Sequence, residues 1–387
     1  MPEPALFVDV LNHPDAFANL RGEWNALLAA SEADTPFLTW EWLYTWWRHL
    51  GERRRLRILA VRRGEELLAV APLALRPNPG GLLPPRFEFL GTGTVGSDYL
   101  DFVARKGSEA VALAALADHA GRQGATLELR QVRGQGSLAA QLAGRLQAAG
   151  WNTSEVKTET CPFIPLKGRS WDSYLASLGS EHRYNFKRRL RKLHEGVDTF
   201  FETAASEGHR RAALALLFDL HEQRWRERGG SDAFPSGKVR AFHDEFTRLA
   251  LARGWLRLFV LWLDGEPAAA LYGLRYGKTF SFYQSGFDPR HAKQSVGLVM
   301  MGLAIKAAIE EGAEEFDLLH GAEAYKFQWA RQSRELVRLE LDPPRAGAVI
   351  YRRFVDAGRA ARRLARRLLP APLAHRLPAG MHPPVRG

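Results

Sequence analysis

Hydrophobic and polar positions follow an order that occurs twice along the chain. Residues 56–75 form two alternating stretches around Arg63-Gly64, which is typical of a β-hairpin, and residues 255–277 repeat this pattern around Gly265-Glu266. After each hairpin come a third strand, a helix, a strand, a further helical piece and a last strand. The repeat predicts an α/β (α+β) protein with two tandem units, each a mixed, largely antiparallel sheet flanked by helices, with the two sheets side by side.

Length and charge divide the chain further. Its 387 residues exceed the usual size of one domain, and the repeat predicts an N-terminal domain over 1–160 and a C-terminal domain over 161–345. The net charge of +11 is concentrated in residues 345–387, where ten Arg and one Asp give +9. The rest of the chain is nearly neutral, so the basic composition does not by itself indicate a nucleic-acid-binding body.

The basic C-terminal segment, 346–387, is predicted to begin with an amphipathic helix over 348–369. Apolar side chains recur at helical spacing between the Arg residues, at Ile350, Phe354, Ala357, Ala361, Leu364 and Leu368. Such a helix suits an anionic membrane surface or an acidic partner helix, and docking on the protein's own body is the alternative. We expect the Pro-rich end beyond Pro370 to be disordered.

The single cysteine and the lack of long apolar runs bear on the compartment. Cys161 excludes an internal disulfide and a Cys-based zinc cluster, and its apolar neighbours predict a buried strand residue. Neither a secretory leader nor a run of 18 apolar residues occurs. We therefore expect a cytoplasmic protein, peripheral at the inner face of the membrane if the basic helix binds there.

We interpret two N-terminal motifs as structural features and not as binding sites. The Trp-rich stretch 40–47 follows the capping residue Thr39 at helical spacing, which predicts an aromatic core face, with a ligand-stacking platform as the alternative. Residues 91–96 spell G-x-G-x-x-G after a strand, but the following residues 97–103 alternate like a strand and open no helix. We interpret this motif as a turn between strands.

A strand–helix–strand unit near the C-terminus is the centre of the functional hypothesis. An aromatic strand over 279–285 leads through a polar approach into a helix that begins near Gly297, and a second strand follows over 315–319. The first amides of a helix have no intrahelical acceptor, so they can bind a phosphate. Arg290 and Lys293 add positive charge beside this helix start.

Residues 316–329 resemble a known signature. They read FDLLHGAEAYKFQW, which resembles the FD-x-x-x-G-x-x-x-YK-x-x-W pattern of the CelD-type acyltransferases. That family is a branch of the GNAT superfamily, often encoded with polysaccharide-biosynthesis machinery and related to the FemAB-type aminoacyl transferases. The resemblance covers about 165–345 and, as a degenerate GNAT-like half, 5–160. One departure is the GNAT pyrophosphate loop, which is reduced here to residues 290–297.

The resemblance implies that an acyl-CoA binds where two parallel strands diverge. Main-chain groups on the first strand would hydrogen-bond the pantetheine and polarise the thioester carbonyl, while amides at the helix start would hold the pyrophosphate. The implied donor-binding residues are Gln284, Ser285, Gly286, Ser295, Val296 and Gly297, with Arg290 and Lys293 as charge partners.

The resemblance also implies candidates for proton transfer during direct attack on the thioester. Tyr325 lies where the superfamily commonly places the tyrosine that protonates the leaving thiolate. His320 and Asp317 are the candidate bases. For Asp317 the alternative is a structural carboxylate that caps or pairs with Lys326, and for His320 it is a solvated loop histidine.

Further side chains are candidates for binding the acceptor. They are Tyr283, Glu323, Lys326, Tyr184, Asn185, His221 and Trp225. Two of them, Tyr184 and Asn185, belong to a basic helix that is either a solvated face or a surface that attracts an anionic acceptor or tRNA.

These observations lead to one functional hypothesis and two alternatives. We expect transfer of an acyl group, such as acetyl, from acyl-CoA to an amine or hydroxyl of a polysaccharide or cell-envelope precursor, without a metal. One alternative is a FemAB-like transferase that uses aminoacyl-tRNA. The other is a non-catalytic scaffold of envelope or polysaccharide synthesis.

Overall fold

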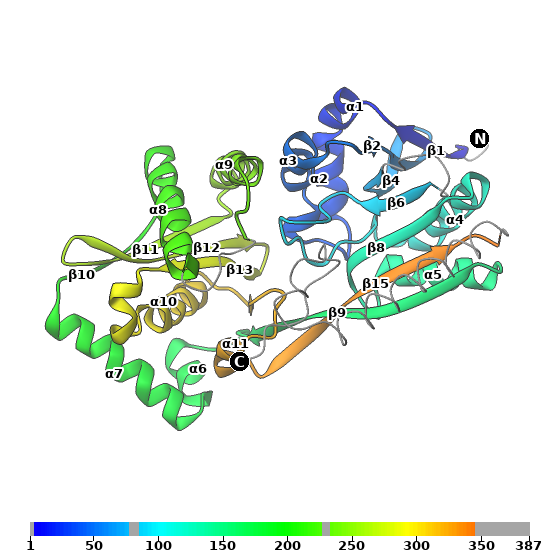
Figure 1. The fold of residues 1–387 in the computed structure, drawn as a ribbon. Coiled ribbons are helices and arrows are strands. Elements are labelled where there is room, and N and C mark those ends of the chain that lie inside the picture. The colour runs from blue at the N-terminus through cyan, green and yellow to red at the C-terminus, as the bar shows by residue number, and fades with distance from the viewer. Residues whose placement is uncertain (1–3, 77–84, 227–232, 345–387) are drawn as a thin grey trace, which may run out of the picture.

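A computed structural model describes residues 4–76, 85–226 and 233–344. Over these residues the chain forms two mixed α/β halves, each covered by helices (Figure 1). The N-terminal half ends with α5 (Leu138–Ala148) and the C-terminal half begins with α6 (Trp171–Ser177), and two long antiparallel strands run between them. The expected fold class, two GNAT-like units with mixed sheets flanked by helices, is confirmed.

The N-terminal half contains a four-stranded sheet that includes the predicted hairpin. The strand order is β1 (Leu6–Leu11), β3 (Ile58–Arg63), β4 (Glu66–Ala71) and β7 (Val103–Ala104). The helices are α1 (Pro14–Asn19), α2 (Arg21–Ala29), the 3-10 turn η1 (Pro36–Leu38), α3 (Trp40–Leu50), α4 (Glu109–Gln123) and α5. Gly64, in the turn between β3 and β4, has a φ of 58°, which the absence of a Cβ permits.

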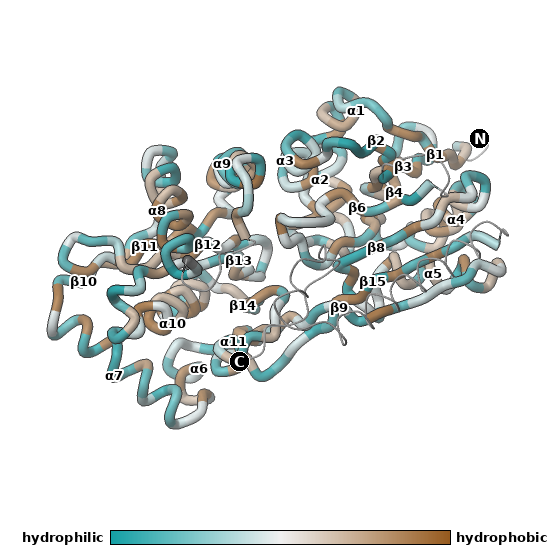
Figure 2. Tube along the Cα trace, viewed as in Figure 1, coloured by the Kyte–Doolittle hydropathy of each residue, from teal (hydrophilic) through white to brown (hydrophobic). Residues whose placement is uncertain are grey.

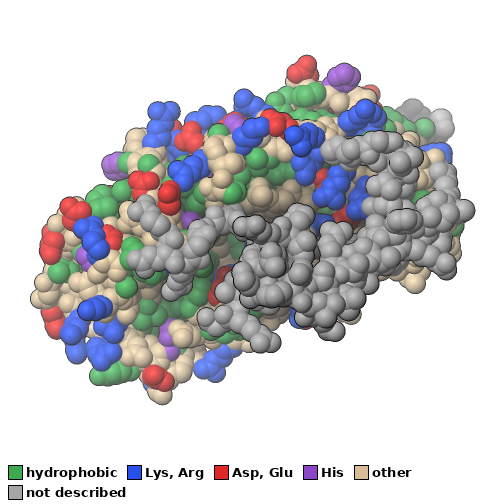
Figure 3. Space-filling model, viewed as in Figure 1, with side chains coloured by type: hydrophobic (Ala, Val, Ile, Leu, Met, Phe, Trp, Pro, Cys, Tyr) green, Lys and Arg blue, Asp and Glu red, His purple; other side chains and the backbone are tan. Residues whose placement is uncertain are grey.

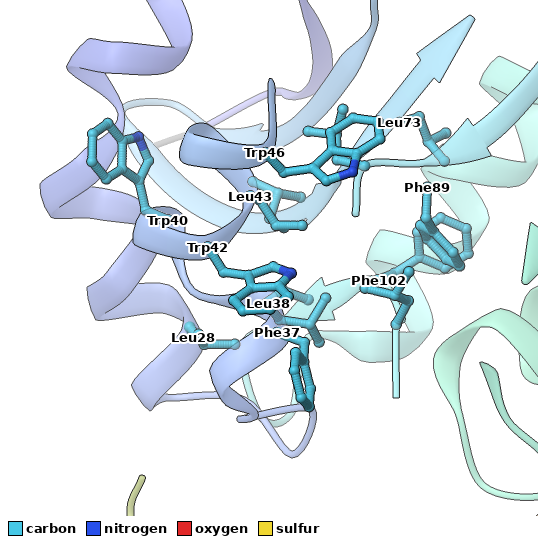
Figure 4. Packing of buried hydrophobic residues seen from close by; sticks show 14 of the residues in the cluster. Leu28, Phe37, Leu38, Trp40, Trp42, Leu43, Trp46, Leu73, Phe89 and Phe102 are labelled. Carbon is cyan, nitrogen blue, oxygen red and sulfur yellow. The ribbon is translucent and has the colours of Figure 1, made fainter. Parts of the chain in front are cut away.

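The Trp-rich stretch forms an aromatic core, as predicted. The Thr39 side chain accepts a hydrogen bond from the amide of Trp42 and so caps α3. Trp42 and Trp46 are buried and point from α3 into the hydrophobic cluster (Figure 4). The ring of Trp42 also contacts Phe242 and Phe246 of the C-terminal half, at centroid distances of 4.9 and 4.7 Å. This core therefore packs the two halves against each other.

An eleven-stranded sheet runs through both halves. Its order is β10 (Thr199–Thr203), β11 (Leu256–Leu263), β12 (Glu266–Tyr276), β13 (Thr279–Phe287), β14 (Glu315–Asp317), β9 (Asn152–Pro165), β15 (Gln332–Asp342), β8 (Thr126–Arg133), β6 (Arg86–Phe89), β5 (Leu73–Leu75) and β2 (Arg55–Leu56). The expectation of two separate sheets side by side is wrong, because β15 pairs with β9 on one side and with β8 on the other. This pairing joins strands that lie far apart in the sequence, where local patterns carry no information.

Helices cover both faces of the C-terminal part of the long sheet. One face is covered by α6, α7 (Ser180–Gly196) and α10 (Val296–Glu310), and the other by α8 (Glu207–Arg226) and α9 (Gly237–Ala252). Two short elements, η2 (Pro289–Gln294) and α11 (Ala324–Trp329), flank the candidate site. Figure 2 shows α7 as mostly hydrophilic and α10 as mostly hydrophobic, which suits a surface helix and a buried one.

Three further predictions can be compared with the structure. Cys161 is a fully buried residue of β9, as predicted. The predicted strand over 97–103 is wrong, because only Val103 pairs, with β4, and Tyr99 has a φ of 57°, which extended strands do not adopt. The predicted basic helix over 348–369 lies outside the described residues. Among the helices described, none is long and apolar enough to cross a bilayer.

Candidate active site

The two parallel strands of the C-terminal half diverge after three residue pairs. β13 and β14 pair from Thr279–Glu315 to Ser281–Asp317. Beyond these pairs β13 continues along β12 as far as Phe287, while the chain after β14 follows β9 through the amide of Leu318, which donates to Pro162. We call this divergence the C-terminal fork, with 282–287 on one side and 318–321 on the other. A fork leaves strand edges that can accept a ligand.

Main-chain groups on the β13 side of the fork are bonded by side chains. The amide of Ser285 donates to the Gln284 side chain at 2.9 Å, and its carbonyl accepts from His221 Nδ1 at 3.0 Å. The pairing of β12 with β13 also shifts register between Tyr272 and Gly273. Such bulges recur beside active sites, where they re-aim a side chain.

Gly286 allows α8 to pack directly on the β13 side of the fork. A Cβ on this residue would lie 2.5 Å from the main-chain nitrogen of His221 and 2.8 Å from the carbonyl carbon of Leu220. Neither main-chain atom can move without shifting the whole helix. The sequence therefore needs glycine here, and α8 brings His221, Arg224 and its neighbour Trp225 to the fork, where the Arg224 guanidinium lies 4.8 Å from the Phe287 ring centre.

The start of α10 has main-chain donors and no side-chain cap. Ser295, the N-cap residue, has a φ of 59° and makes no side-chain hydrogen bond to the helix. The first helical hydrogen bonds run from the amides of Leu298 and Val299 to the Ser295 carbonyl. The amides of Val296 and Gly297 precede these bonds. Among the described residues, neither amide donates to a main-chain carbonyl. An anion can therefore bind at this helix start.

The two cations expected beside this helix start are placed differently. The Arg290 guanidinium binds Asp288 at 2.6 Å, so part of its charge is neutralised. The Lys293 side chain is exposed, and its main-chain carbonyl accepts a hydrogen bond from Arg189 of α7 at 2.9 Å.

A histidine–carboxylate pair joins the two halves at the other side of the fork. His320 Nδ1 lies 2.9 and 3.0 Å from the two oxygens of Asp98, and the His320 amide donates to the same carboxylate at 2.8 Å. Asp98 is fully buried, whereas the His320 side chain is 38 % exposed. The Asp98 charge raises the pKa of His320 above its ordinary value. Because Nδ1–H faces the carboxylate, Nε2 keeps the lone pair that a base needs.

Residues with unusual main-chain conformations flank this pair. Tyr99 has a φ of 57°, Leu319 of 54° and Gln131 of 57°, and none of the three is glycine. Tyr99 follows Asp98 and Leu319 precedes His320, while the Gln131 side chain donates to Asp98 at 3.4 Å. Left-handed conformations of this kind cost roughly 1–3 kcal/mol each and collect at functional sites. We infer that the packing of the two halves holds Asp98 and His320 together against this cost.

Asp317 is buried beneath the pair in a separate network. Its carboxylate accepts from the Tyr99 hydroxyl at 2.7 Å, from Arg334 at 3.1 Å and from the amide of Leu319 at 2.8 Å. Burial raises the pKa of Asp317 to about 6. The pairing with Lys326 that we considered is wrong, because the Lys326 ammonium instead donates to the carbonyl of His320 at 2.6 Å.

The short helix α11 lies next to His320. The ammonium of its buried residue Lys326 also binds Glu323 at 3.1 Å and so ties the start of α11 to the His320 backbone. Tyr325 is half-buried against the hydrophobic cluster around α10. Burial and the charge of Glu323 raise the pKa of the Tyr325 hydroxyl, while Arg224 of α8 opposes this shift.

Tyr283 points away from the fork toward the N-terminal half. Its hydroxyl donates to the carbonyl of Val95 and lies 3.3 Å from His243 Nε2. Of the other proposed acceptor residues, Tyr184 and Asn185 lie apart on α7, where Tyr184 is 63 % exposed. His221 and Lys326 hydrogen-bond main-chain carbonyls of the fork, Glu323 pairs with Lys326, and the Trp225 ring lies 6.2 Å from that of His221.

A large polar cavity lies on the N-terminal-half side of the same strands. Its volume is about 1150 Å³, and its lining includes Ser281, Asp317, Tyr99 and Arg334. His320 does not line it. The remaining lining residues come from both halves and are mostly polar. In the described part of the chain no group of three or more His, Cys, Asp or Glu is arranged to hold a metal ion.

Sequence reasoning missed Asp98, Tyr99 and Gln131. We placed Asp98 in a predicted strand, and the carboxylate that faces His320 is 222 residues away from it in the sequence. The one usable signal was the Gly-rich turn before Asp98, which permits close approach: a Cβ on Gly96 would lie 3.0 Å from His320 Cε1.

Comparisons with known proteins bear on the family of one segment and on the fold. Residues 180–327 match the family described as acetyltransferase (GNAT) domain. Among solved structures, FemX superposes with a TM-score of 0.59 at 12 % identity, covering 82 % of this chain and 95 % of FemX. L-PGS from Bacillus licheniformis superposes with a TM-score of 0.51 at 12 % identity, covering 85 % and 93 %. The C-terminal domain of a putative lysylphosphatidylglycerol synthetase from Agrobacterium fabrum gives 0.51 at 12 % identity, covering 87 % and 95 %.

At these identities the superpositions bear on the fold alone. No curated protein sequence matches the chain. Residues 180–327 therefore match an acetyltransferase (GNAT) domain, and the chain has a two-domain GNAT-like fold.

Proposed function

We propose that the protein transfers an acyl group from acyl-CoA to an amine or hydroxyl acceptor at the C-terminal fork. The observation that carries this proposal is the Asp98–His320 pair, which sets a histidine with a free Nε2 beside the diverging strands of a GNAT domain. The acceptor class that we propose is a polysaccharide or cell-envelope precursor. The CelD-type resemblance supports that choice.

The proposed reaction begins with proton removal from the acceptor. His320 Nε2 takes the proton of the attacking amine or hydroxyl, and Asp98 stabilises the imidazolium that forms through its bond to Nδ1–H. The acceptor atom then bonds to the thioester carbon. The negative charge that develops on the carbonyl oxygen needs a nearby donor. The amide of Ser285 suits this role, because its acceptor among the described residues is the Gln284 side chain.

The proposed reaction ends with loss of the thiolate. When the tetrahedral intermediate collapses, the carbon–sulfur bond breaks, and the CoA thiolate takes a proton from the Tyr325 hydroxyl. Solvent returns a proton to Tyr325 and removes the one held by His320, so protons balance over the cycle. The amides of Val296 and Gly297, with Lys293 beside them, would bind the CoA diphosphate.

The closest alternative is a transfer of an aminoacyl group from tRNA, as the FemAB resemblance implies. The observation in its favour is the row of cations on one face of α7, which are Arg183, Lys187, Arg188 and Arg191. Lys and Arg side chains gather on the surface over α7 (Figure 3). A non-catalytic scaffold is the remaining alternative. Thermal unfolding with acetyl-CoA, longer acyl-CoAs and bulk tRNA separates these functions. A donor present at 100 times its Kd stabilises the protein by about 2.7 kcal/mol. We expect this gain with an acyl-CoA and not with tRNA, and no gain with any donor would favour the scaffold.

The pH dependence of acyl transfer tests the proposed base. A base must be neutral to accept a proton, and Asp98 raises the pKa of His320, so activity should rise with pH through a value above 6.5. Asp98→Asn removes the charge that raises this pKa, so the rise should move to lower pH while the maximum rate also falls. Release of free CoA thiol, measured with a panel of amine and sugar acceptors, reports the rate. An unchanged profile in the variant would remove the pair from the mechanism.

A further inference from the structure

The glycine-rich turn at residues 91–97, which we call the Gly turn, borders the His320 ring from the N-terminal half. A Cβ on Gly96 would lie 3.0 Å from His320 Cε1. Asp98 follows the turn directly, and its two oxygens lie 2.9 and 3.0 Å from His320 Nδ1. The same short segment therefore packs against the imidazole at two ring atoms, so the position of the Gly turn determines how the ring is oriented.

Main-chain hydrogen bonds alone hold the Gly turn weakly. The amides of Thr92 and Gly96 donate to the carbonyls of Phe89 and Gly93, both at 3.4 Å. Well-formed N–H···O bonds are about 2.7–3.2 Å long. In the described part of the chain the other amides of residues 91–97 donate to no main-chain carbonyl. Side chains must therefore fix the position of the turn.

The first side chain from outside the turn is that of Trp42 in α3. Its indole nitrogen donates to the Ser97 hydroxyl at 2.8 Å, and that hydroxyl donates to the carbonyl of Gly91 at 2.8 Å. Trp42 and Ser97 are both buried, where a hydrogen bond is stronger than in water. These two bonds tie the ends of the Gly turn to each other and to α3.

The second side chain from outside the turn is that of Tyr283 in β13. Its hydroxyl donates to the carbonyl of Val95, the residue before Gly96. Its ring contacts the ring of Trp42 at a centroid distance of 5.7 Å. Tyr283 also lies two residues before Ser285, whose amide is the proposed donor to the thioester oxygen. Tyr283 therefore connects the strand of the proposed donor site to the turn that borders His320.

His243 of α9 completes the network around the Tyr283 hydroxyl. A carbonyl can only accept, so the hydroxyl proton points to Val95, and the phenol oxygen can accept from His243 Nε2 at 3.3 Å. Burial lowers the pKa of His243 to about 3 and raises that of Tyr283. Both groups therefore stay neutral over the pH range in which a histidine such as His320 titrates.

We propose that Tyr283 is a positioning residue for acyl transfer, which acts by holding Val95 so that Gly96 and Asp98 orient the His320 ring. Tyr283 acts through the Gly turn and does not itself touch His320. Small displacements of a catalytic group are costly, since a shift of about 1 Å can lower a rate by about 100-fold. This inference rests on the proposed role of His320 as the base, and it adds the residue through which β13 controls that base.

A titration of His320 by nuclear magnetic resonance tests the proposal without an assay of activity. The His320 signal is the one that the His320→Gln variant lacks. Asp98 raises the pKa of His320, Glu159 of β9 adds to this effect, and Lys326 of α11 opposes it. Tyr283→Phe leaves these three charges in place but frees the Gly turn to move Asp98 away. His320 should therefore titrate at a lower pH in Tyr283→Phe than in the wild type, and at a still lower pH in Asp98→Asn.

The rate of CoA thiol release should change with the titration. Tyr283→Phe should lower this rate by about 10-fold, with an unchanged KM for acyl-CoA, and should move its rise with pH to lower pH. Ser97→Ala removes the bonds to Trp42 and Gly91 and should shift the His320 titration in the same direction. The control Tyr276→Phe, which removes a hydroxyl bonded to Asp34 at 2.6 Å on the neighbouring strand β12, should behave as wild type.

The outcomes separate this proposal from the function on which it rests. Urea unfolding first establishes that each variant is folded under the conditions of the titration. If Tyr283→Phe and Ser97→Ala titrate as the wild type does, even with lower stability, their bonds are structural alone and the proposal is overturned. If the titration shifts as expected but the wild-type protein releases no CoA with any acceptor, the positioning of His320 stands and the proposed transfer is overturned.

Discussion

Each half of the molecule contains a pair of parallel strands that diverge, and the two forks are filled differently. In the N-terminal half, β6 and β8 pair only at Arg86–Thr126 and Phe87–Leu127 before they separate. The chain then fills this fork itself, because the buried Leu100 donates its amide to the carbonyl of Gln131 at 2.9 Å. In the C-terminal fork, the main-chain groups of Ser285 are instead hydrogen-bonded to two side chains, those of Gln284 and His221, which can move away.

The helix starts beside the two forks differ in the same way. At the start of α5, the Asp101 carboxylate accepts from the amides of Leu138 and Ala139, and Ser137 caps the helix as well. At the start of α10 no side chain does so. The amides at the start of α5 are therefore occupied by a carboxylate of the same half, whereas those at the start of α10 have no side-chain cap, and the N-terminal half supplies Asp98 to the other half.

The largest loss of activity is expected from replacing His320, which pairs with Asp98 of the other half. His320→Gln should lower acyl transfer by about 100-fold or more, because general-base catalysis contributes 10²–10⁴-fold. The rate of CoA thiol release measures it. The control His119→Gln, on α4 of the N-terminal half, should leave the rate unchanged. A His320 variant that retains the wild-type rate would show that the pair is structural.

The next largest effect is a loss of stability expected from disturbing the close packing of α8 on β13. Gly286→Ala should lower the free energy of unfolding by roughly 1–3 kcal/mol, because the new Cβ meets the main chain of α8. The control Gly144→Ala, in α5 with nothing within 4 Å of the added Cβ, should raise it by about 0.5–1 kcal/mol. Urea unfolding compares the two, and equal stabilities would mean that α8 does not pack as described.

A smaller loss of stability is expected from removing Asp101, which caps the start of α5 within the N-terminal half. Asp101→Ala removes the acceptor for two amides of α5 and should lower the free energy of unfolding by about 1–2 kcal/mol. Affinity for acyl-CoA, measured by calorimetry, should stay unchanged because we place the donor in the C-terminal fork. Loss of acyl-CoA affinity in a folded variant would assign a ligand to the N-terminal fork.

The smallest effect concerns the conformation at the start of α10. Ser295→Gly should raise the free energy of unfolding by up to about 1 kcal/mol, because glycine adopts a φ of 59° without strain. Ser108→Gly, at the start of α4 with a φ of −109°, should lower it by a few tenths of a kcal/mol. Thermal unfolding can rank the two variants, and a destabilised Ser295→Gly would show that the serine side chain stabilises this turn.

The order of elements around the C-terminal fork could be predicted because it depends on local features. Alternation marks β13, a long apolar run marks α10, and the short strand β14 precedes a His-Gly pair by two residues. Such periodic patterns are visible in any single sequence. The buried position of Cys161 followed in the same way from its apolar neighbours.

The Asp98–His320 pair could not be predicted because neither residue belongs to a regular element. Asp98 lies in an irregular segment whose alternation resembled a strand, since Leu100 and Phe102 are both buried. The left-handed conformation of Tyr99 turns this segment toward β14, and no residue type in it signals that turn. The joining of the two sheets through β15 escaped prediction because strand partners far apart in the sequence leave no local pattern.

Hydrogen–deuterium exchange with and without acetyl-CoA tests the difference between the two forks most directly. Peptides that cover 284–298 should exchange about 10-fold more slowly or better when the donor is bound at saturation, because a bound ligand suppresses local opening. Peptides that cover 89–101 of the N-terminal fork should exchange at the same rate in both conditions. Protection confined to 89–101, or no protection in either fork, would contradict the assignment of the donor site to the C-terminal half.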